Sequence, residues 1–411
     1  MNIKTRKIKH GGHVIGSGGF GCIFKPALKC KTQKNNLKKI NKRDTGKITK
    51  LMTVKHATKE YNEIQKFNKI LSTINNYKKY FLISDLTLCE PYPLSQEDLI
   101  NYKKKCKALN KKDITEGNIN NNLDEVLALN MPYGGKDLGT FLESNLSHKE
   151  LIKLNNSLVD LLSYGILPMN NLHLYHCDIK DSNILVEKYA DSSLYTRIID
   201  WGLSTEYNKE HKIPDILSRR PLQFNVPFSI ILFNNEFIEH YSKFLKKYKT
   251  PDYSSIRVFV INYLFLWINI RGEGHLKLMN EIMCKLFYNE LPVLNKNKRK
   301  KFIEYEFTYF YIIDYLAKIL EKYTYNEEFH LYEYFNEVFI KNIDIWGFVM
   351  IYLPIIEKIF EKYYSITLKK TELFKSLKFI IVHFLFECPV DRIDTTSLIN
   401  ELTKINKYIT G

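Results

Sequence analysis

The sequence predicts an α+β fold, with short strands in its amino-terminal part and helices in the remainder. Apolar runs typical of strands occur at 14–23, 48–52 and 126–129. Residues 233–341 are instead aromatic, lysine-rich and helical in pattern. With 411 residues, 45 % apolar and 14 % aromatic, the chain is long enough for two or three lobes or domains and is not disordered in composition.

The net charge of +16 comes mainly from lysine. A basic chain can bind nucleic acid, anionic lipid or acidic substrates. This chain is also rich in Asn, Ile and Tyr, whose codons are AT-rich like those of Lys. An AT-rich genome therefore explains the excess of lysine and the positive net charge. Basic motifs interleaved with aromatic residues are not evident, and we expect no nucleic-acid partner.

The seven cysteines are scattered, odd in number and without a C-x-x-C pair. We therefore expect neither a disulfide framework nor a zinc site, and a reducing compartment. Residues 1–10 are basic and lack the apolar segment of a secretory signal. The longest apolar stretch, 258–270, is interrupted by Asn262 and Asn269 and is too short to span a bilayer, which favours a core helix. We expect a soluble, cytoplasmic protein without a membrane partner.

Residues 14–23 predict a strand, a glycine-rich turn and a second strand. The segment follows the pattern G-x-G-x-x-G-x-V, with Ile23 at the final position. Glycines let backbone N–H groups close over phosphates and permit positive φ at the turn. A Rossmann turn is similar but opens into a helix, whereas Cys22-Ile23-Phe24 continues as a strand.

A lysine stands on the next predicted strand and is a candidate to bind phosphates beside this turn. Residues 27–47 are polar and predict an insertion loop, and the alternating strand 48–52 that follows contains Lys50. Lys55 lies too close to the following helix and Lys25 belongs to the glycine-rich hairpin, so Lys50 is preferred.

A helix is predicted over 57–71, with Glu60 and Glu63 one turn apart. Either carboxylate can hold the Lys50 ammonium, and Glu60 is preferred.

Further along, residues 80–88 predict a strand, and residues 90–122 predict a helical or loose insertion. The strand 126–129 then leads into Met131-Pro132-Tyr133-Gly134-Gly135.

The segment His176-Cys177-Asp178-Ile179-Lys180-Asp181-Ser182-Asn183 follows two predicted helices, 137–145 and 149–167. The apolar runs 184–186 and 197–199 predict a hairpin that brings Asn183 close to Asp200. Two carboxylates and an amide on converging loops suit Mg²⁺ that is also bound by phosphates.

These motifs resemble those of eukaryotic-type serine/threonine protein kinases, whose loops read H-R-D-x-K-x-x-N and D-F-G; here the second reads Asp200-Trp201-Gly202. The resemblance implies a bilobal kinase-like fold, with a β-rich lobe at 1–131 (insertion about 90–122) and a helical lobe at 132–411 (insertion about 233–341). It implies ATP and Mg²⁺ as cofactors and a protein substrate. The insertions and glycine-rich opening resemble kinases of large nucleocytoplasmic DNA viruses, which implies the host cytoplasm or a virion.

By the same resemblance, Asp178 would accept the proton of the attacking hydroxyl and Lys180 would face the transferred phosphoryl group, while Asn183 and Asp200 would hold Mg²⁺. Met131 would be the gatekeeper beside adenine, and Asp137 would reach the ribose. The residues implied to bind ATP are Ile15, Gly16, Ser17, Gly18, Gly19, Phe20, Gly21, Ile23, Lys50, Glu60, Met131, Pro132, Gly134 and Asp137.

The sequence also departs from the kinase pattern. Cys177 stands where regulated kinases carry an arginine that pairs with a phosphorylated activation segment, so we expect activity without such phosphorylation. No A-P-E motif follows Asp200, and residues 218–229 are its expected substitute. Asp344-Ile345-Trp346-Gly347 resembles D-x-W-S-x-G, and Arg392 lies in a stretch that resembles P-x-x-R-P, with its partner open.

Three alternatives remain at this point. Small-molecule kinases of the aminoglycoside and choline type often read I-I-D-W-E, close to Ile199-Asp200-Trp201, but Gly202, Lys180 and the glycine-rich turn argue against them. A pseudokinase scaffold usually loses one of the catalytic residues, and none is lost here. A nucleic-acid-binding protein would use the basic surface.

Overall fold

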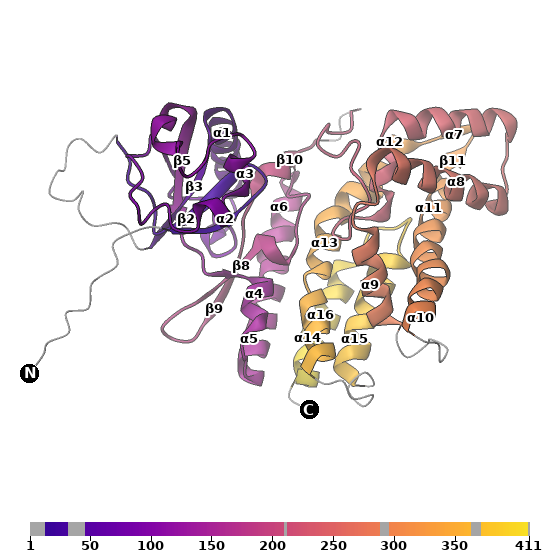
Figure 1. Cartoon of the computed structure of the whole chain (residues 1–411). Coiled ribbons are helices and arrows are strands. Elements are labelled where there is room, and N and C mark those ends of the chain that lie inside the picture. Colours follow the sequence, from indigo (N-terminus) through magenta and orange to yellow (C-terminus); the bar gives the residue numbers. More distant parts are fainter. Residues whose placement is uncertain (1–12, 32–45, 209–211, 288–295, 363–370, 410–411) are drawn as a thin grey trace, which may run out of the picture. The chain divides into compact units, whose positions relative to one another are not determined.

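The computed structural model describes residues 13–31, 46–208, 212–287, 296–362 and 371–409. The chain divides into two compact units, Met1–Gly135 and Lys136–Gly411, each taken by itself below. The N-terminal unit contains a small antiparallel sheet and the larger C-terminal unit is mostly helical (Figure 1). The predicted combination of amino-terminal strands and later helices is therefore confirmed.

The sheet of the N-terminal unit has five strands in the order β1-β2-β3-β5-β4, and all neighbours pair antiparallel. The strands are β1 (His13–Ser17), β2 (Gly21–Lys25), β3 (Lys47–Thr53), β4 (Thr87–Cys89) and β5 (Val126–Pro132). Helix α1 (Val54–Leu71) follows β3 directly and contacts β3 and β5. Its buried residues recur at helical spacing, as an amphipathic helix requires: Ala57, Ile64, Phe67 and Leu71.

The strand predicted over 80–88 is wrong except at its end, because only Thr87–Cys89 pairs with β5. Tyr80, Phe81 and Ile83 are buried, but they lie in irregular backbone after a 3₁₀ turn. Asp85 has φ of 62°, which ends any extended run before β4. An apolar run of this length can fill a core as a loop as well as a strand.

The predicted insertion at 90–122 contains short helices, as expected. They are α2 (Tyr102–Lys105), α3 (Lys107–Asn110) and a 3₁₀ turn at Ile119–Asn121, and a further 3₁₀ turn at Leu123–Glu125 precedes β5. Most of the loop predicted over 27–47, and the basic segment 1–10, lie outside the described residues.

The prediction against disulfides is wrong. Cys22 in β2 is bonded to Cys106 beside α2, and Cys30 is bonded to Cys89 in β4. The partners are 84 and 59 residues apart in sequence, so no local spacing marks them. Three described cysteines are free, namely Cys177, Cys284 and Cys388. The expectation of a reducing compartment thus loses its support from the cysteines.

In the C-terminal unit, β8 (Ile184–Lys188) and β9 (Leu194–Ile198) form the predicted hairpin, joined on one edge by β6 (Lys136–Asp137). Two small ribbons pair β7 (Leu174–Tyr175) with β10 (Thr205–Glu206), and β11 (Thr324–Tyr325) with β12 (Glu328–Phe329). The first helices are α4 (Leu138–Glu143), α5 (His148–Asp160) and α6 (Leu167–Asn171), with a π-helical turn at Leu161–Ile166.

The remaining helices are α7 (Asn235–Lys247), α8 (Tyr253–Arg271), α9 (Leu276–Leu286), α10 (Lys296–Ile303), α11 (Phe310–Tyr323), α12 (Leu331–Tyr334), α13 (Ile340–Met350), α14 (Leu353–Lys362), α15 (Glu372–Ile381) and α16 (Thr395–Ile409). The helical character predicted for 233–341 is confirmed for the described residues, apart from the ribbon β11–β12. The lysine-rich residues 296–301 are helical as part of α10.

Within the described residues, two helical stretches are long and apolar enough to cross a membrane by length and composition alone: Tyr253–Arg271 and Leu331–Lys358. The second is 83 % buried, as in the core helices of soluble proteins, whereas only 28 % of the first is buried. The expectation that 258–270 is a core helix is therefore only half right. One face of α8 is buried, while Val258, Phe265 and Ile270 are exposed.

Candidate active site

The glycine-rich turn joins β1 to β2 in the N-terminal unit. The N–H of Gly18 donates to the carbonyl of Gly21 at 2.9 Å, and Phe20 is exposed and stacks on His56. Gly16, Gly18 and Gly19 have open space where a Cβ would stand, and none has positive φ. The positive φ that glycine permits is therefore not used at this turn, and what these glycines provide is an uncovered backbone.

Gly21 has a different role from the other glycines of the turn. A Cβ at this position would come within 2.4 Å of the Met52 side chain and 2.8 Å of the Leu51 carbonyl. Glycine here therefore allows β2 to pack closely against β3. Ile15 is exposed and Ile23 is half-buried on the same hairpin.

The glycine-rich hairpin is held by the inserted segment. The N–H of Val14 donates to the Ile100 carbonyl at 3.1 Å, and the N–H of Ala108 donates to Ser17 Oγ at 3.1 Å. The disulfide Cys22–Cys106 adds a covalent link at the end of the turn. The Ser17 hydroxyl, predicted to serve ATP, is thus already engaged within the protein.

Lys50 in β3 forms an ion pair with Glu60 in α1. Its Nζ lies 2.7 Å from Oε1 and 2.8 Å from Oε2, and both side chains are only 12 % exposed. Glu60, the preferred glutamate, is the partner, whereas Glu63 pairs with Lys59 at the surface. A partly buried ammonium held in this position can bind an anion.

The other two lysines considered for this position lie elsewhere. Lys55 is exposed in the first turn of α1, and Lys25 in β2 lies over the Tyr133 ring, 3.1 Å from its centre.

The residues predicted to contact adenine and ribose lie at the end of β5 and beyond it. Met131 and Pro132 end β5, and the division between the units follows Gly134 and Gly135. Asp137, predicted to reach a ribose, caps α4 through a hydrogen bond from the Thr140 N–H at 2.9 Å.

In the C-terminal unit, the loop from His176 to Asn183 is anchored by Asp344 of α13. The buried carboxylate of Asp344 accepts hydrogen bonds from the N–H groups of His176 and Cys177, both at 2.8 Å. Cys177 has φ of 60°, an unusual backbone conformation that these bonds hold in place. The His176 ring contacts the Ile199 carbonyl at 3.0 Å and packs edge-on against Trp201.

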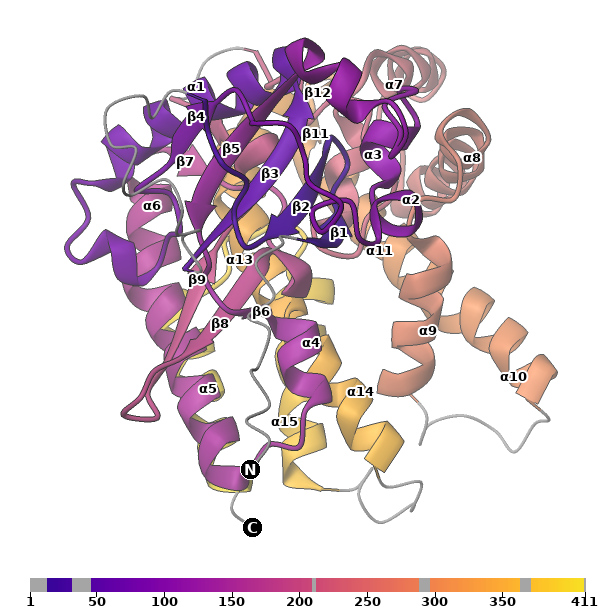
Figure 2. The same ribbon diagram turned by 60° about the vertical axis from the view of Figure 1, so that its left-hand side comes forward.

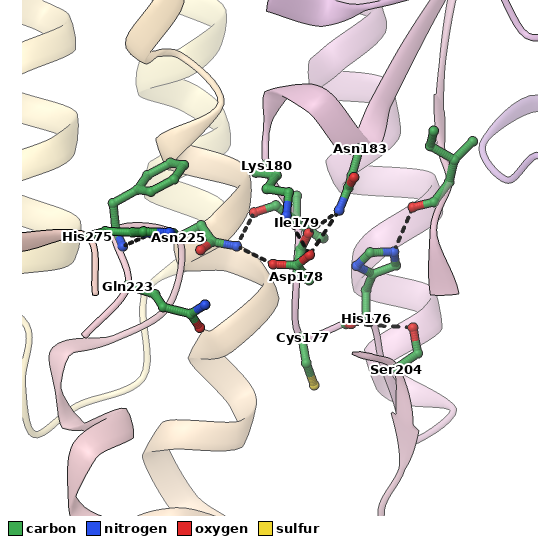
Figure 3. Close-up of polar contacts among 12 residues, drawn as sticks. His176, Cys177, Asp178, Ile179, Lys180, Asn183, Ser204, Gln223, Asn225 and His275 are labelled. Atoms are coloured by element: carbon green, nitrogen blue, oxygen red, sulfur yellow. Dashed lines mark hydrogen bonds and ion pairs between the residues drawn. The ribbon is translucent and has the colours of Figure 1, made fainter. Parts of the chain in front are cut away.

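Asp178 is the most heavily contacted carboxylate of the loop (Figure 3). Its Oδ2 accepts from Lys180 Nζ at 2.7 Å and from Asn183 Nδ2 at 3.1 Å, and its Oδ1 accepts from Asn225 Nδ2 at 2.9 Å. Burial alone would raise the pKa of Asp178, but the hydrogen bond and charge of Lys180, with the Asn225 hydrogen bond, lower it below its ordinary value. The carboxylate is therefore ionised at neutral pH and can accept a hydrogen bond from a hydroxyl.

Asn183 and Asp200 lie on backbone segments joined by a hydrogen bond. The N–H of Ile199, immediately before Asp200, donates to the Asn183 carbonyl at 3.0 Å. Asn183 donates through Nδ2 to Asp178, which leaves its amide oxygen on the other side of the group. Asp200 is exposed, with φ of 65°. An amide oxygen and a carboxylate are hard donors that fit Mg²⁺ shared with phosphates. No cluster of three or more His, Cys, Asp or Glu side chains suited to a metal occurs in the described part of the chain.

Two side chains that sequence reasoning missed, Arg220 and Asn225, reach this loop from the segment after Asp200. Besides its bond to Asp178, Asn225 donates to the Ile179 carbonyl at 3.2 Å. Buried Arg220 donates through Nη1 to the Cys177 carbonyl at 2.8 Å, and its Nη2 lies 3.8 Å from Oδ1 of Asp178. A lone Asn and a lone Arg in a loop carry no sequence signal, so only the tertiary structure assigns them to the site.

Arg392, whose partner was open, forms an ion pair with Glu337 and donates through Nε to the Glu337 carbonyl at 2.7 Å.

No protein-family model matches the sequence, and no curated protein matches it significantly. The resemblance to kinases accordingly depends on the motif residues and their contacts alone.

Proposed function

We propose that the chain is a kinase-fold enzyme that uses ATP and Mg²⁺ to phosphorylate serine or threonine hydroxyls of a protein. The observation that carries this proposal is the arrangement around Asp178, an ionised carboxylate contacted by Lys180, Asn183 and Asn225. The Lys50–Glu60 pair and the uncovered glycine-rich turn in the N-terminal unit support it independently.

In the proposed reaction, the substrate hydroxyl oxygen forms a bond to the γ-phosphorus while the bond from that phosphorus to the ADP oxygen breaks. Asp178 orients the hydroxyl and accepts its proton, and Lys180 stabilises negative charge on the transferred group. Mg²⁺, held by Asn183 and Asp200 together with phosphate oxygens, would neutralise the charge of the triphosphate. Lys50, fixed by Glu60, would bind phosphate oxygens.

The direct test is phosphate transfer by the purified chain with Mg²⁺ and labelled ATP. A generic basic protein serves as one acceptor, and choline and an aminoglycoside serve as the others. Labelling of the protein alone, abolished by Lys50→Met and by Asp200→Ala, is the expected result. Labelling of the small molecules would favour a small-molecule kinase, and no labelling with any acceptor, including the chain itself, would favour a scaffold.

Phosphorylation of the segment after Asp200 should not be needed for activity. Arg220 already links this segment to the catalytic loop through the Cys177 carbonyl, a connection made without any phosphate. The variant carrying Ser204→Ala, Thr205→Ala and Ser218→Ala is therefore expected to keep kcat within about tenfold of the wild type, since its hydroxyls make only local or weak bonds. A larger loss, reversed by acidic residues at these positions, would contradict this prediction.

Asn225→Ala should change the pH dependence of activity. Its hydrogen bond stabilises the ionised form of Asp178, so its removal raises the pKa of Asp178 and moves the acid limb of the kcat/KM profile to higher pH. We expect kcat to fall roughly tenfold, as for loss of a hydrogen bond to a charged group, with KM for ATP unchanged.

The matched control is Asn156→Ala, an exposed asparagine of α5 whose side-chain oxygen accepts from Asn406 Nδ2. It should leave the acid limb in place. An Asn225→Ala profile that overlays the wild type would show that Asn225 does not tune Asp178.

A further inference from the structure

The C-terminal unit exposes an apolar patch on α8, on the π-helical turn Glu304–Tyr309 and at the start of α11, which follows that turn directly. It comprises Val258, Phe265, Tyr305 and Phe310, which are 59, 45, 63 and 45 % exposed. Val258 and Phe265 are seven residues apart, so they share one face of α8. Helices α8 and α11 pack side by side (Figure 1). Four large apolar side chains in water over one pair of helices indicate an interaction surface.

Ring contacts show that the patch is continuous. The ring of Tyr309 lies 5.6 Å from that of Phe265 and 5.8 Å from that of Tyr305, measured between centroids. The guanidinium of Arg257, next to Val258, lies over the Phe310 ring at 5.5 Å. Residues from two helices far apart in sequence thus form one aromatic surface.

A basic segment adjoins the patch. Five of the six residues 296–301 are Lys or Arg, and Lys298, Lys300 and Lys301 are exposed on α10, at the outer edge of the unit (Figure 2). Three or four residues separate Lys298, Lys301 and Tyr305 in turn, so these side chains lie on one helical face. This face connects the exposed lysines to the apolar patch. Glu304 and Glu306 are the next carboxylates along the chain, and the four described cations at 298–301 outnumber these two.

We propose that this face, the apolar patch together with Lys298, Lys300 and Lys301, docks on the surface of an anionic lipid membrane. Aromatic side chains beside exposed lysines fit the boundary between acyl chains and charged headgroups. A second copy of the chain would bring two sets of like charges together, which disfavours a dimer on this face. RNA would need the lysines but would leave Val258 and Phe310 without a role.

The docking is in the plane of the membrane and does not span it. Although α8 is long and apolar enough to cross a bilayer, its other face is packed into the unit through Ile256, Val260, Tyr263, Leu264 and Trp267. Only the exposed half is available to lipid. This proposal departs from the sequence-based expectation of no membrane partner and does not depend on the proposed kinase activity.

The test is sedimentation of the full chain with vesicles of phosphatidylcholine, with or without roughly one third phosphatidylserine. Wild type should bind the anionic vesicles more tightly, and added salt should weaken this binding. Each lysine near the surface contributes about fivefold, so Lys298→Gln, Lys300→Gln and Lys301→Gln together should reduce binding about a hundredfold. Phe265→Ser with Tyr305→Ser should reduce it at least about tenfold, from the apolar area removed.

Matched controls exist on the same chain. Lys103→Gln, Lys104→Gln and Lys105→Gln remove three consecutive exposed lysines from α2, and Tyr164→Ser removes an aromatic side chain that is 59 % exposed on the π-helical turn between α5 and α6. Both controls should bind vesicles like wild type. Hydrogen exchange of the wild-type chain should slow in 253–271 and 296–310 when vesicles are added, which checks the surface without any substitution.

Three results would overturn the proposal: no sedimentation of wild type with anionic vesicles, aromatic substitutions without effect while the lysine variant loses vesicles and RNA alike, or a dimer in solution that Phe265→Ser dissociates. The second result would assign the lysines to polyanions in general, and the third would assign the patch to a second copy.

Discussion

The Asp178→Asn variant should lose about three orders of magnitude in kcat for phosphate transfer, within the range for removal of a general base. Asparagine has the same shape but cannot take up the hydroxyl proton. Its NH₂ group would also face donors, because Lys180, Asn183 and Asn225 all donate to the present carboxylate. The measurement is labelled-phosphate transfer to the protein acceptor at saturating Mg²⁺ and ATP.

The matched control is Asp191→Asn, an exposed carboxylate in the turn between β8 and β9. It keeps the charge change of the test variant and should retain wild-type activity. Full activity in the Asp178→Asn variant, with its thermal unfolding unchanged, would remove the main support for catalysis and leave the scaffold as the better account.

Loss of the disulfide between Cys22 and Cys106 should destabilise the N-terminal unit by about 2–4 kcal/mol, the usual range for a native disulfide. The bond closes a long loop, because its partners are 84 positions apart in sequence, and both cysteines are buried. For Cys22→Ser with Cys106→Ser, amide hydrogen exchange in β1, β2 and β3 should accelerate accordingly. Reduction of the wild type breaks Cys30–Cys89 as well and should accelerate this exchange at least as much.

Two comparisons make this result specific. Cys284→Ser removes a free, half-buried thiol and should not alter exchange in the sheet. All three tryptophans, Trp201, Trp267 and Trp346, lie in the C-terminal unit, so their fluorescence follows that unit separately. Unchanged exchange in β1–β3 of the double variant would mean that the hydrogen bonds at Val14 and Ser17 hold the hairpin without the disulfide.

Local patterns were sufficient for much of the fold. The strands β1, β2, β3 and β5 are short alternating or β-branched runs bounded by turn signals, and α1 has an apolar face at helical spacing. In these segments, local propensity and burial agree. They disagree at 80–88, where buried Tyr80 and Phe81 lie in a loop, because periodicity does not distinguish a buried loop from a short strand.

In the candidate site as well, local motifs predict some residues, and only the tertiary structure reveals others. Lys50, Glu60, Asp178 and Asn183 stand within recognisable motifs, and the predicted pairing of Lys50 with Glu60 is confirmed. Arg220 and Asn225 reach the loop 176–183 from more than forty residues away. Cysteine pairing likewise depends on which strands become neighbours, and counting cysteines does not reveal it.

The anchoring of the loop 176–183 by Asp344 has a consequence for how the protein is made. The two N–H groups that this carboxylate satisfies belong to residues translated some 168 positions earlier. While the ribosome is still adding α11 and α12, His176 and Cys177 have no such acceptor, and the loop has no reason to hold the backbone conformation seen at Cys177. We therefore expect nascent chains and products of premature stop codons upstream of α13 to lack this ordered loop. The loop takes up its conformation only after α13 has been synthesised.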